Sequence, residues 1–349
     1  MALDSIEYCT RHMPRYYGYL EDTYFFAESG LTPVEEIALG FIQLRLIVRR
    51  MIERGVDVDS FAPRIAMLVD CGMDFYEEVA KIRATRRLYA KMMRDEFSAK
   101  NDRSQSLTIT SHTSGLSLTA QQPANNIVRG TMQALSLIMG GVQALEISAF
   151  DEAFRTPSKE AHLLGLRTQQ IADLESGVAR VADPFGGSYF MEQLTDEMES
   201  RIRSRIDEIE VLGDAEELCR QGFFRDIFHR AMEDSHRLVE NGELPIVGVN
   251  VHQLAEEDDT LLRDVASGKI DPVHEHTERV EKFRQSRDIS KTCEGLARIK
   301  QAMQSSDNLV EAIVSAMDAD ATVGEIVTVI RRSVGIESDP FDQPLPEEM

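Results

Sequence analysis

Apolar residues recur along this chain in two alternating patterns. Short runs rich in β-branched, aromatic and other apolar residues, at 19–26, 65–69, 107–109 and 142–148, have the length and composition of strands. Each run is followed by a longer segment whose apolar positions lie three and four residues apart, as on one face of a helix. Strands that alternate with helices at a spacing of roughly 40 residues predict a parallel α/β fold.

The helices that follow these strands carry start and stop signals. Thr32 and Glu35 predict a capping box, with Pro33 at the first helical position, and Gly55 ends that helix. Gly140 with Gly141 ends a later one in the same way. Helices are expected at about 33–54, 74–97, 123–139, 155–176, 196–237, 256–308 and 308–334.

The stretch after the third predicted strand is the most unusual part of the chain. Residues 111–123 read SHTSGLSLTAQQP, a run of small hydroxyl residues that opens into a helical pattern. This run is too polar for a core segment. Because loops at the carboxyl ends of parallel strands carry the functional groups of barrel enzymes, we expect this loop to form part of a binding site.

Composition narrows the range of partners. The 349 residues carry a formal net charge of −22, which argues against binding to nucleic acid or to an anionic membrane surface. No window is as long and apolar as a transmembrane helix, and the first residues show no export signal. The four cysteines form no C-x-x-C pair, which is typical of reduced thiols in a cytoplasmic protein.

Several long segments together resemble the large subunit of the adenosylcobalamin-dependent acyl-CoA mutases, the family of methylmalonyl-CoA mutase. These segments are RHMPRYY, RGVDVDSFAPR, FYEEVAKIRATRRLYAKMM, HTSGLSLTAQQPANNIVR, FDEAF, ESGVARVADPFGGSYFMEQLT, PIVGVN and ATVGE, and they follow the family's order. The resemblance implies the second half of a (β/α)8 TIM-type barrel, strands five to eight, at 1–195. A mostly helical, linker-like region at 196–335 and an acidic, disordered tail at 336–349 are expected to follow.

The resemblance also implies a function. The chain is expected to be one component of a split mutase that rearranges the carbon skeleton of a CoA thioester, an isomerase of the intramolecular transferase type. None of the eight histidines stands in the family's D-x-H-x-x-G motif, so adenosylcobalamin would be bound jointly with a separate cobalamin-binding domain. Half a barrel exposes two strand edges, which predicts a partner chain with the first half of the barrel, or self-association.

Candidate catalytic and substrate-binding residues follow from the matched positions. Tyr24 and Phe25 stand where the family has a Tyr-His pair. The family's histidine is thought to donate a hydrogen bond to the thioester carbonyl. Phe25 cannot donate one, and its alternative role is packing in the barrel core. Arg64 matches an arginine near the CoA arm, or makes an interstrand ion pair. Glu152 matches an acid near the adenosyl group, and its neighbour Asp151 would point the opposite way on a strand.

Candidate cofactor-binding residues lie in the loop after the third strand. His112 stands where the family has a glutamine on the corrin side, or is a loop histidine with other partners, while Thr113, Ser114 and Gly115 match the family directly. Ala66 replaces a serine that helps to hold the CoA arm. Further matches are as readily explained by capping and tethering of a helix: Asn125, Asn126 and Arg129.

Two functional interpretations stay open at this point. The losses at Phe25 and Ala66 favour a degenerate, non-catalytic scaffold or binding subunit over an active mutase component. A substrate with a different acyl group is compatible with the active mutase component, because a phenylalanine favours a less polar group than a histidine does. His274 and His276 lie in a charged helical pattern, which indicates a solvated face, and no metal site is expected.

Overall fold

The computed structural model describes residues 1–255, 257–266, 273–305, 307–339 and 343–345. Packing divides the chain into two compact units. The sheet unit is Tyr19–Ile270, and the helical unit combines Met1–Gly18 with Asp271–Met349. No helix in the described ranges is long and apolar enough to cross a membrane.

The sheet unit is built on four parallel strands in the order β1-β2-β3-β4. The strands are β1 (Tyr19–Asp22), β2 (Ile65–Val69), β3 (Thr108–His112) and β4 (Ala144–Glu146). Tyr19 pairs with Ile65, Ala66 with Thr108, and Thr110 with Ala144. The predicted parallel α/β fold is therefore confirmed, with every strand beside its neighbour in sequence.

Helices connect the strands and make up most of the described part of the helical unit. The sheet unit contains α2 (Tyr24–Ala27), α3 (Pro33–Glu53), α4 (Val58–Phe61), α5 (Phe75–Lys91), α6 (Asn125–Gly140), α7 (Lys159–Leu174), α8 (Tyr189–Glu210), α9 (Ala215–Arg220), α10 (Phe223–Glu240) and α11 (Thr260–Ala266). The helical unit contains α1 (Ala2–His12), α12 (His274–Ser286), α13 (Ile289–Ala302), α14 (Leu309–Asp318) and α15 (Val323–Ser333). Short helical turns include η1 (Ala62–Arg64), η2 (Met92–Glu96), η3 (Asp102–Gln105) and η4 (Val178–Arg180).

Local signals explain where the principal helices begin and end. The side chain of Thr32 accepts from the backbone N–H of Glu35, and Pro33 occupies the first turn of α3. Gly55, just past α3, has a φ of +80°, and Gly141 after α6 is left-handed at +76°. Only a residue without a Cβ takes this conformation at little cost, so both predicted helix ends are confirmed.

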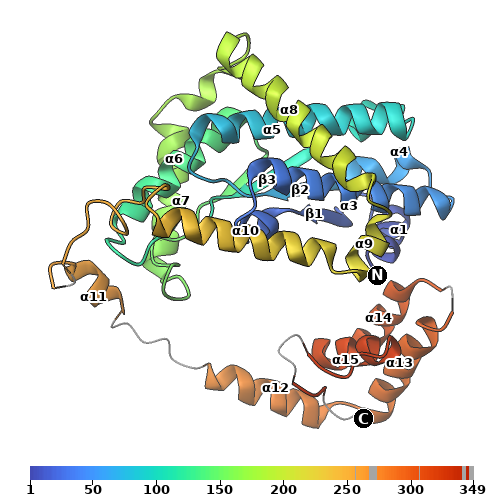
Figure 1. Cartoon of the computed structure of the whole chain (residues 1–349). Coiled ribbons are helices and arrows are strands. Elements are labelled where there is room, and N and C mark those ends of the chain that lie inside the picture. Colours follow the sequence, from blue (N-terminus) through green and yellow to red (C-terminus); the bar gives the residue numbers. More distant parts are fainter. Residues whose placement is uncertain (256, 267–272, 306, 340–342, 346–349) are drawn as a thin grey trace. The chain divides into compact units, whose positions relative to one another are not determined.

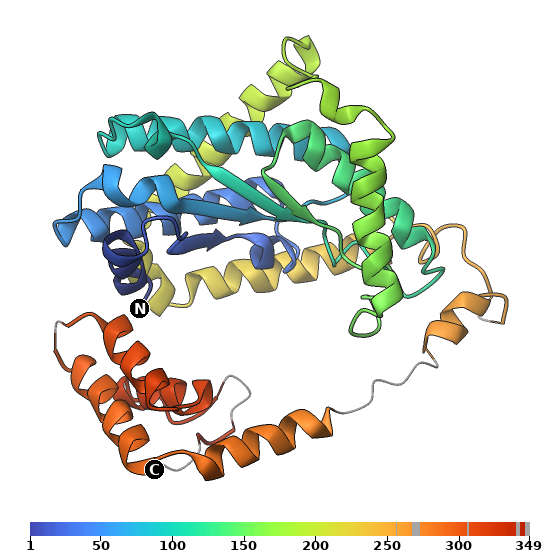
Figure 2. The ribbon, with the colours of Figure 1, turned by 180° about the vertical axis from the view of Figure 1, so that it is seen from behind.

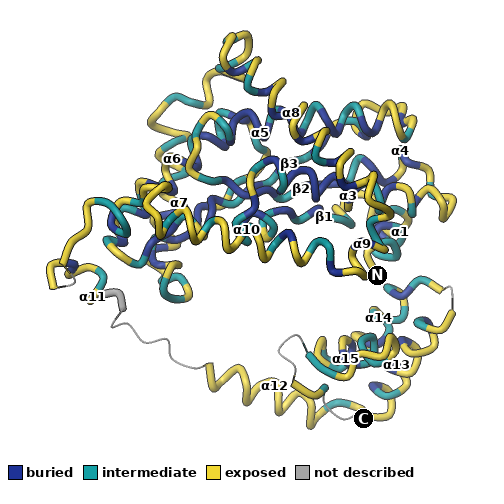
Figure 3. Tube along the Cα trace, viewed as in Figure 1, coloured by how far each residue is buried: buried dark blue, intermediate teal, exposed yellow. Residues whose placement is uncertain are grey.

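The hydrophobic core of this unit lies between the sheet and its helices. A Cβ placed on Gly40 of α3 would lie 3.8 Å from both Glu21 Cγ and Met67 Cε, so these two side chains face α3. Helix α8 packs against both α3 and α5. Figures 1 and 2 show the strands side by side with these helices layered beside them, and Figure 3 shows the most buried trace in the strands, α3 and α5.

Several predicted boundaries were wrong: the fourth strand is shorter than 142–148, the helix predicted at 196–237 is divided into α8, α9 and α10, and three further boundaries differ. The first strand ends at Asp22 rather than at residue 26, because the carbonyl of Thr23 accepts the backbone N–H groups of Phe26 and Ala27 and a helical turn begins there. The third strand runs on to His112, so part of the polar stretch pairs as sheet. Helix α8 starts at Tyr189, seven residues earlier than predicted, because Ser188 caps it.

The helical unit has its own core. Buried side chains from α13, α14 and α15 form it, and α1 packs on α14. Thr322 and Glu325 of the ATVGE segment make a reciprocal capping box at the start of α15. The predicted disordered tail at 336–349 lies partly outside the described residues, and its described part contains a bridge between Ser338 and Pro344. The domain boundaries predicted from sequence at residues 195 and 335 stay predictions.

Candidate functional site

The face of the sheet turned away from α3 becomes polar at the carboxyl ends of its strands. Since Glu21 and Met67 face α3, alternation along the strands turns Asp22 and Leu68 to the opposite face. On β3 the same alternation gives that face Thr108, Thr110 and His112. The side chains that gather at its carboxyl end are Asp22, Tyr24, Asp70, His112 and Glu146.

His112 connects three of the strands at this end. Its ring centroid lies 5.0 Å from that of Tyr24, which directly follows β1. Its Nε2 atom lies 3.2 Å from Glu146 Oε2 on β4. The charge of His112 also helps to lower the pKa of Asp22, although burial raises that pKa overall. The prediction that His112 sits at the strand end of a polar site is therefore compatible with its surroundings, and its role toward a ligand stays a prediction.

The Tyr24 hydroxyl lies among carboxyl groups. Burial raises the pKa of Tyr24, and the charges of Glu28, Asp70 and Glu152 raise it further. The backbone of Gly115 lies beside the tyrosine oxygen. Tyr24 thus keeps its proton at any physiological pH, and its hydroxyl is placed beside the loop that the sequence singled out.

Glu28 fastens that loop. Its Oε1 atom accepts a hydrogen bond of 2.7 Å from the Ser114 hydroxyl, and its carboxylate accepts the backbone N–H of Leu116 at 2.9 and 3.1 Å. A Cβ on Gly115 would lie 2.9 Å from Glu28 Oε2 and 3.3 Å from the Tyr24 oxygen. Any side chain at Gly115 would therefore push the loop away from Tyr24.

Thr113 holds the neighbouring strand end. Its hydroxyl accepts the backbone N–H of Ser148 at 2.9 Å, and its carbonyl accepts the Ser148 hydroxyl at 2.7 Å. Both groups are buried. Thr113 is thus placed as a structural tie between β3 and the segment after β4, with its hydroxyl already engaged.

Glu152 and Asp151 lie on a turn, because β4 ends at Glu146. The strand-alternation argument for choosing between these acids was therefore wrong, although the choice itself has support. Asp151 is fully buried and accepts hydrogen bonds of 3.0 Å from Arg155 Nε and the backbone of Ser158. Glu152 is exposed, accepts the backbone N–H of Ala149 at 2.9 Å, and is close enough to Tyr24 to affect its pKa.

Phe25 and Arg64 do not join this cluster in the same way. Phe25 stacks edge-on against Tyr24 at 5.4 Å but is 65% exposed, so no described residue packs it as core. Arg64 precedes β2, while the Tyr24 cluster lies after the strands. Six residues separate Arg64 from Asp70. At the rise of an extended strand, this places Arg64 roughly 20 Å from the Tyr24 cluster, at the amino-terminal end of the strands.

Sequence reasoning missed two residues of the cluster, Glu28 and Asp70. Signals for both exist in the chain. Glu28 follows Tyr24 by four residues, which is one helical turn and puts both side chains on the same side. Asp70 directly follows the apolar run 65–69, the position at which strand-end functional groups are expected.

The chain was compared with protein families and with curated proteins. The family model described as methylmalonyl-CoA mutase matches residues 1–336. The chain belongs to the methylmalonyl-CoA mutase family. The resemblance predicted from the motifs is therefore confirmed.

Family members from distant organisms match almost the whole chain. It is 36% identical over 330 residues to the 2-hydroxyisobutanoyl-CoA mutase large subunit of Aquincola tertiaricarbonis, with 94% of this chain and 58% of that protein covered. Methylmalonyl-CoA mutase of Rhizobium meliloti is 36% identical over 340 residues, covering 96% and 47%. The human mitochondrial enzyme is 34% identical over 333 residues, covering 95% and 44%. The chain spans about half the length of these relatives.

One long family motif, RVADPFGGSY, acts as a support in this structure. Asp183 in the motif has a positive φ of 45° and pairs with Arg83 of α5, and the same arginine binds Glu192 at 2.7 Å. Ser188 caps α8 through the backbone N–H of Met191. The motif thus joins the start of α8 to α5, next to the end of β2.

Another family segment, PIVGVN, ties down the start of α6. Arg129 is buried and donates to Asn126 Oδ1 at 2.7 Å, to the Thr119 hydroxyl at 2.9 Å and to the carbonyl of Val247 at 2.7 Å. Asn126 in turn donates to the carbonyl of Phe150 at 2.9 Å. The tethering role considered for Asn126 and Arg129 from sequence is therefore confirmed.

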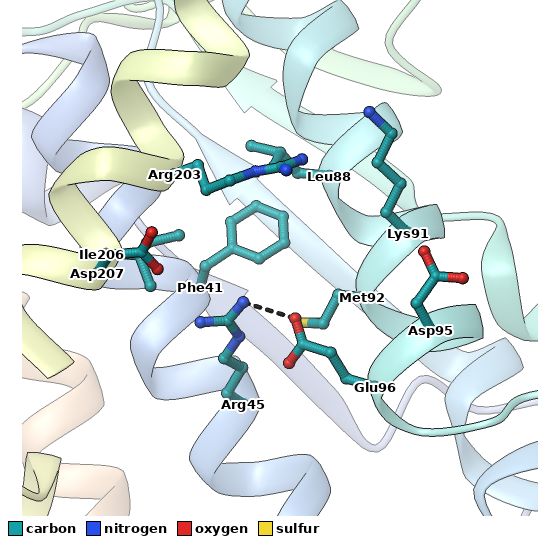
Figure 4. A pocket seen from close by; sticks show the side chains of 10 residues that line it. All are labelled: Phe41, Arg45, Leu88, Lys91, Met92, Asp95, Glu96, Arg203, Ile206 and Asp207. Atoms are coloured by element: carbon teal, nitrogen blue, oxygen red, sulfur yellow. Dashed lines mark hydrogen bonds and ion pairs between the residues drawn. The ribbon is translucent and has the colours of Figure 1, made fainter.

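A separate cavity of about 300 Å³ lies among α3, α5, η2 and α8 (Figure 4). Its apolar lining includes Phe41 and Ile206, and its charged residues are largely paired. Arg45 binds Glu96 at 2.6 Å, and Arg203 binds Glu199 at 2.8 Å. The cavity is lined by the middle of α3 and the last turns of α5, and none of its lining residues belongs to the Tyr24 cluster.

Proposed function

We propose that this chain is one component of an adenosylcobalamin-dependent acyl-CoA mutase, in which its four strands form half of a (β/α)8 barrel. The observation that carries the proposal is the cluster at the carboxyl ends of the strands. Three positions that match the family motifs lie at this end: the Cβ position of Gly115 is 3.3 Å from the Tyr24 oxygen, and the charge of Glu152 helps to raise the pKa of the same hydroxyl. Family membership alone would not require these residues to meet.

The half-barrel is supported by the surface of the sheet itself. Parallel sheets are normally covered on both faces, because their crossover helices and the closing strands bury them. Within the sheet unit, Leu20 of β1 is 44% exposed, and Thr110 and His112 of β3 are only half-buried. The edges of β1 and β4 also lack a strand neighbour within the described sheet. Complementary polypeptide with the other strands would cover this face.

The open face suits an extended, polar substrate arm. It carries the small residue Ala66 and the hydroxyl residues Thr108 and Thr110 along the middle of the strands. Arg64 stands at one end, where its guanidinium can pair with a phosphate or carboxylate. The Tyr24 cluster stands at the other end, roughly 20 Å away. A CoA thioester is long enough to reach from a charged anchor to a reacting acyl group over such a distance.

The residues present fit a large, flat cofactor at the carboxyl end. Leu116 follows the loop of Ser114 and Gly115 and is 54% exposed, and Phe25, beside Tyr24, is 65% exposed; the imidazole of His112 also lies beside Tyr24. Such a surface can pack against a macrocycle and hydrogen-bond to its edge. Bound adenosylcobalamin would supply the radical that starts a 1,2-rearrangement, which the protein has no side chain to generate.

The described residues would then bind and orient. Tyr24 holds its proton and can donate it to a substrate oxygen. Glu28 keeps the loop of Ser114 and Gly115 close to Tyr24, and so fixes the distance between substrate and cofactor surfaces. Glu152, exposed on its turn, can accept a hydrogen bond from a hydroxyl group of the cofactor. Exclusion of water would require the complementary half of the barrel.

Two substitutions support a second candidate function, that of a non-catalytic scaffold. Phe25 removes a hydrogen-bond donor and Ala66 removes a hydroxyl, and both changes fit a non-catalytic scaffold of the same family. A scaffold would still bind its partner chains but would not turn over any acyl-CoA. The two functions therefore differ in activity and agree in assembly.

The test is co-expression of the chain with candidate partners that carry the remaining barrel strands and a cobalamin-binding domain. We expect a stable complex that binds adenosylcobalamin and isomerises an acyl-CoA from a panel that includes methylmalonyl-CoA and 2-hydroxyisobutanoyl-CoA. In it, Glu152→Gln should lower kcat while folding is unchanged, and Glu160→Gln on α7, an exposed acid away from the cluster, should have no effect. An assembled complex that turns over no member of the panel would favour the scaffold.

A further inference from the structure

Glu36, in the first turn of α3, is a buried acid on which three donors converge. Its Oε1 atom accepts from the Thr23 hydroxyl at 3.0 Å and from the backbone N–H of Asp70 at 2.9 Å. Its Oε2 atom accepts from Lys81 Nζ at 2.7 Å. A carboxylate accepts at both of its ends, whereas the amide of a glutamine would place an N–H donor against one of these donors. The position therefore requires an acceptor at each end of the group.

Lys81 fixes the orientation of this carboxylate. Its Nζ atom also donates to the carbonyl of Asp70 at 2.9 Å, so that the residue after β2 is held through both of its backbone groups. The side chains of Glu36 and Lys81 are each only 1% exposed. Replacing a buried ion pair by apolar residues is often neutral or stabilising, so stability alone does not explain such a pair. A geometric role explains it, because the pair holds backbone groups at the end of a strand.

The Oε1 atom of Glu36 joins the ends of two strands. Thr23 directly follows β1, and Asp70 directly follows β2. The backbone N–H of Thr23 also donates to the carbonyl of Leu68 at 2.9 Å, and its hydroxyl lies 2.9 Å from the same carbonyl. The two segments are therefore fixed relative to each other at the point where they leave the sheet.

Thr23 is held as closely on its other side. A Cβ added to Gly40 of α3 would lie 2.4 Å from the Thr23 methyl carbon, too close for two carbon atoms. Glycine is unfavourable inside a helix, and the close approach of Thr23 explains why this position has no side chain. Tyr24 is the next residue in the chain, so the point at which it leaves the sheet is set by these contacts of Thr23.

The other strand end leads to the loop opposite Tyr24. Cys71 is the second residue after β2, and its carbonyl accepts the backbone N–H of Ser114 at 2.9 Å. Gly115 comes next, and its Cβ position lies 3.3 Å from the Tyr24 oxygen. The buried carboxylate is therefore connected through short paths to both sides of the Tyr24 cluster.

We propose that Glu36 is a positioning residue that sets the distance between the Tyr24 hydroxyl and the loop of Ser114 and Gly115, and so determines where the reacting part of an acyl thioester can lie. Glu36 acts through Thr23 on one side and through the backbone after β2 on the other. The thioester part rests on the proposed mutase function, and the effect on Tyr24 does not.

The effect on Tyr24 can be tested on the chain alone by NMR with tyrosine labelled with 13C at Cζ. Eight tyrosines give eight signals, and the signal lost in Tyr24→Phe is that of Tyr24. Thr23→Val removes the hydroxyl that binds Glu36 and keeps the methyl group beside Gly40, and it should displace the Tyr24 signal. Thr23→Ser keeps the hydroxyl and should leave the signal in place. A Tyr24 signal that stays in place in Thr23→Val, or moves only in Thr23→Ser, would overturn the proposal.

Glu36→Leu and Glu78→Leu form a matched pair of variants. Both carboxylates lie 2.7 Å from Lys81 Nζ and both side chains are at most 4% exposed, but no hydrogen bond in the described structure joins Glu78 to Thr23 or Asp70. Both variants should lower the urea midpoint of the sheet unit, and Glu36→Leu alone should displace the Tyr24 signal. Equal displacement in the two variants would overturn the assignment to Glu36. If Glu36→Leu does not fold, the two Thr23 variants decide.

The thioester part is tested in the assembled complex. Glu36→Leu should lower kcat about 100-fold, since a displacement of roughly 1 Å can have such an effect, while KM changes less than about threefold because the Arg64 end of the sheet is untouched. Glu78→Leu should keep kcat within about threefold of the wild type. Equal kcat in Glu36→Leu and the wild type would overturn this part. A wild-type complex without turnover would contradict the proposed function, and the Tyr24 signal would still decide the role of Glu36.

Discussion

The two units of the chain bury their central ion pairs in opposite electrostatic settings. In the sheet unit, Lys81 is shared among more carboxyl groups than it can neutralise, and burial raises the pKa values of Glu36 and Asp70. In the helical unit, Arg287 pairs with Glu325 through two hydrogen bonds of 2.6 and 2.7 Å, and the pKa of Glu325 falls to about 2. Burial therefore dominates the pKa of the acids around Lys81, whose charge is shared, whereas the hydrogen bonds from Arg287 dominate the pKa of Glu325.

The two settings predict opposite responses to pH. An acid whose pKa is raised in the folded state stabilises the fold below its unfolded pKa, and that contribution is lost as the pH rises through the folded value. An acid whose pKa is lowered stabilises the fold above its unfolded pKa, and loses that contribution as the pH falls. The sheet unit should therefore weaken toward high pH, and the helical unit toward low pH.

The largest expected effect is that of Lys81→Met. It leaves Glu36 and Glu78 buried without a cation, and loss of one partner of a buried pair costs about 3–5 kcal/mol. Hydrogen exchange of peptides from α5, followed in increasing urea, measures this in the sheet unit. Lys91→Met on the same helix is the control, because Lys91 is 42% exposed and its pair with Glu199 should contribute no more than about 1 kcal/mol. Equal losses in the two variants would contradict the description of Lys81 as the centre of a buried cluster.

A smaller effect, spread over pH, is expected for Glu21→Gln. Burial raises the pKa of Glu21 to about 8, opposed by the hydrogen bond from Tyr19. Between about pH 5 and 8 the folded wild type keeps a proton that the unfolded chain releases, which costs about 1.4 kcal/mol of stability per pH unit. Urea unfolding at pH 5, 6, 7 and 8 measures this. The free energy of unfolding of the variant should fall less steeply with pH than that of the wild type, by this slope. Parallel curves would mean that Glu21 is ionised in the folded chain.

The sequence allowed the framework of this comparison to be predicted, but not the cluster itself. Thr32, Gly55 and Gly141 are local signals, and each helix end they predict was found where expected. Glu36 and Lys81 lie in helices of mixed polarity, where charged residues usually face water. They are buried because β2 and α3 pack against α5. The spacing of apolar residues along the sequence does not indicate such tertiary packing.

The candidate site was predictable to a similar extent. The loop of Ser114 and Gly115 stood out by composition and by its family motif, and it does lie beside Tyr24. The first strand was predicted too long, because the aromatic residues after Asp22 have the composition of a strand while a helical turn begins at Thr23. Asp70 follows no motif, and only its place at the end of β2 indicates a role.

In the helical unit, Glu325→Gln should cost about 1–2 kcal/mol. The change removes the charge from a two-point pair with Arg287 and weakens the capping box with Thr322. The sign of its pH dependence distinguishes it from the sheet unit: wild-type stability should fall as the pH drops from about 4.5 toward 2, and the variant should lack that loss. Hydrogen exchange of α15 peptides measures this loss of stability. Glu294→Gln on the exposed side of α13 is the control. A variant that still loses stability over this range would show that another acid is responsible.

The smallest effect, and the one that best separates geometry from charge, is that of Arg287→Lys. Lysine keeps the positive charge but cannot form two parallel bonds to Glu325 while also donating to the carbonyl of Asp320, which Arg287 reaches at 2.9 Å. We expect a loss of about 1 kcal/mol, seen as faster exchange at the start of α15. Arg284→Lys is the control. Arg284 is 53% exposed and lies 3.4 Å from Glu325, farther than Arg287, so this variant should not measurably change the exchange of α15. If Arg287→Lys is as stable as the wild type, charge alone accounts for the low pKa of Glu325, and the difference between the two units reduces to the number of acids around each cation.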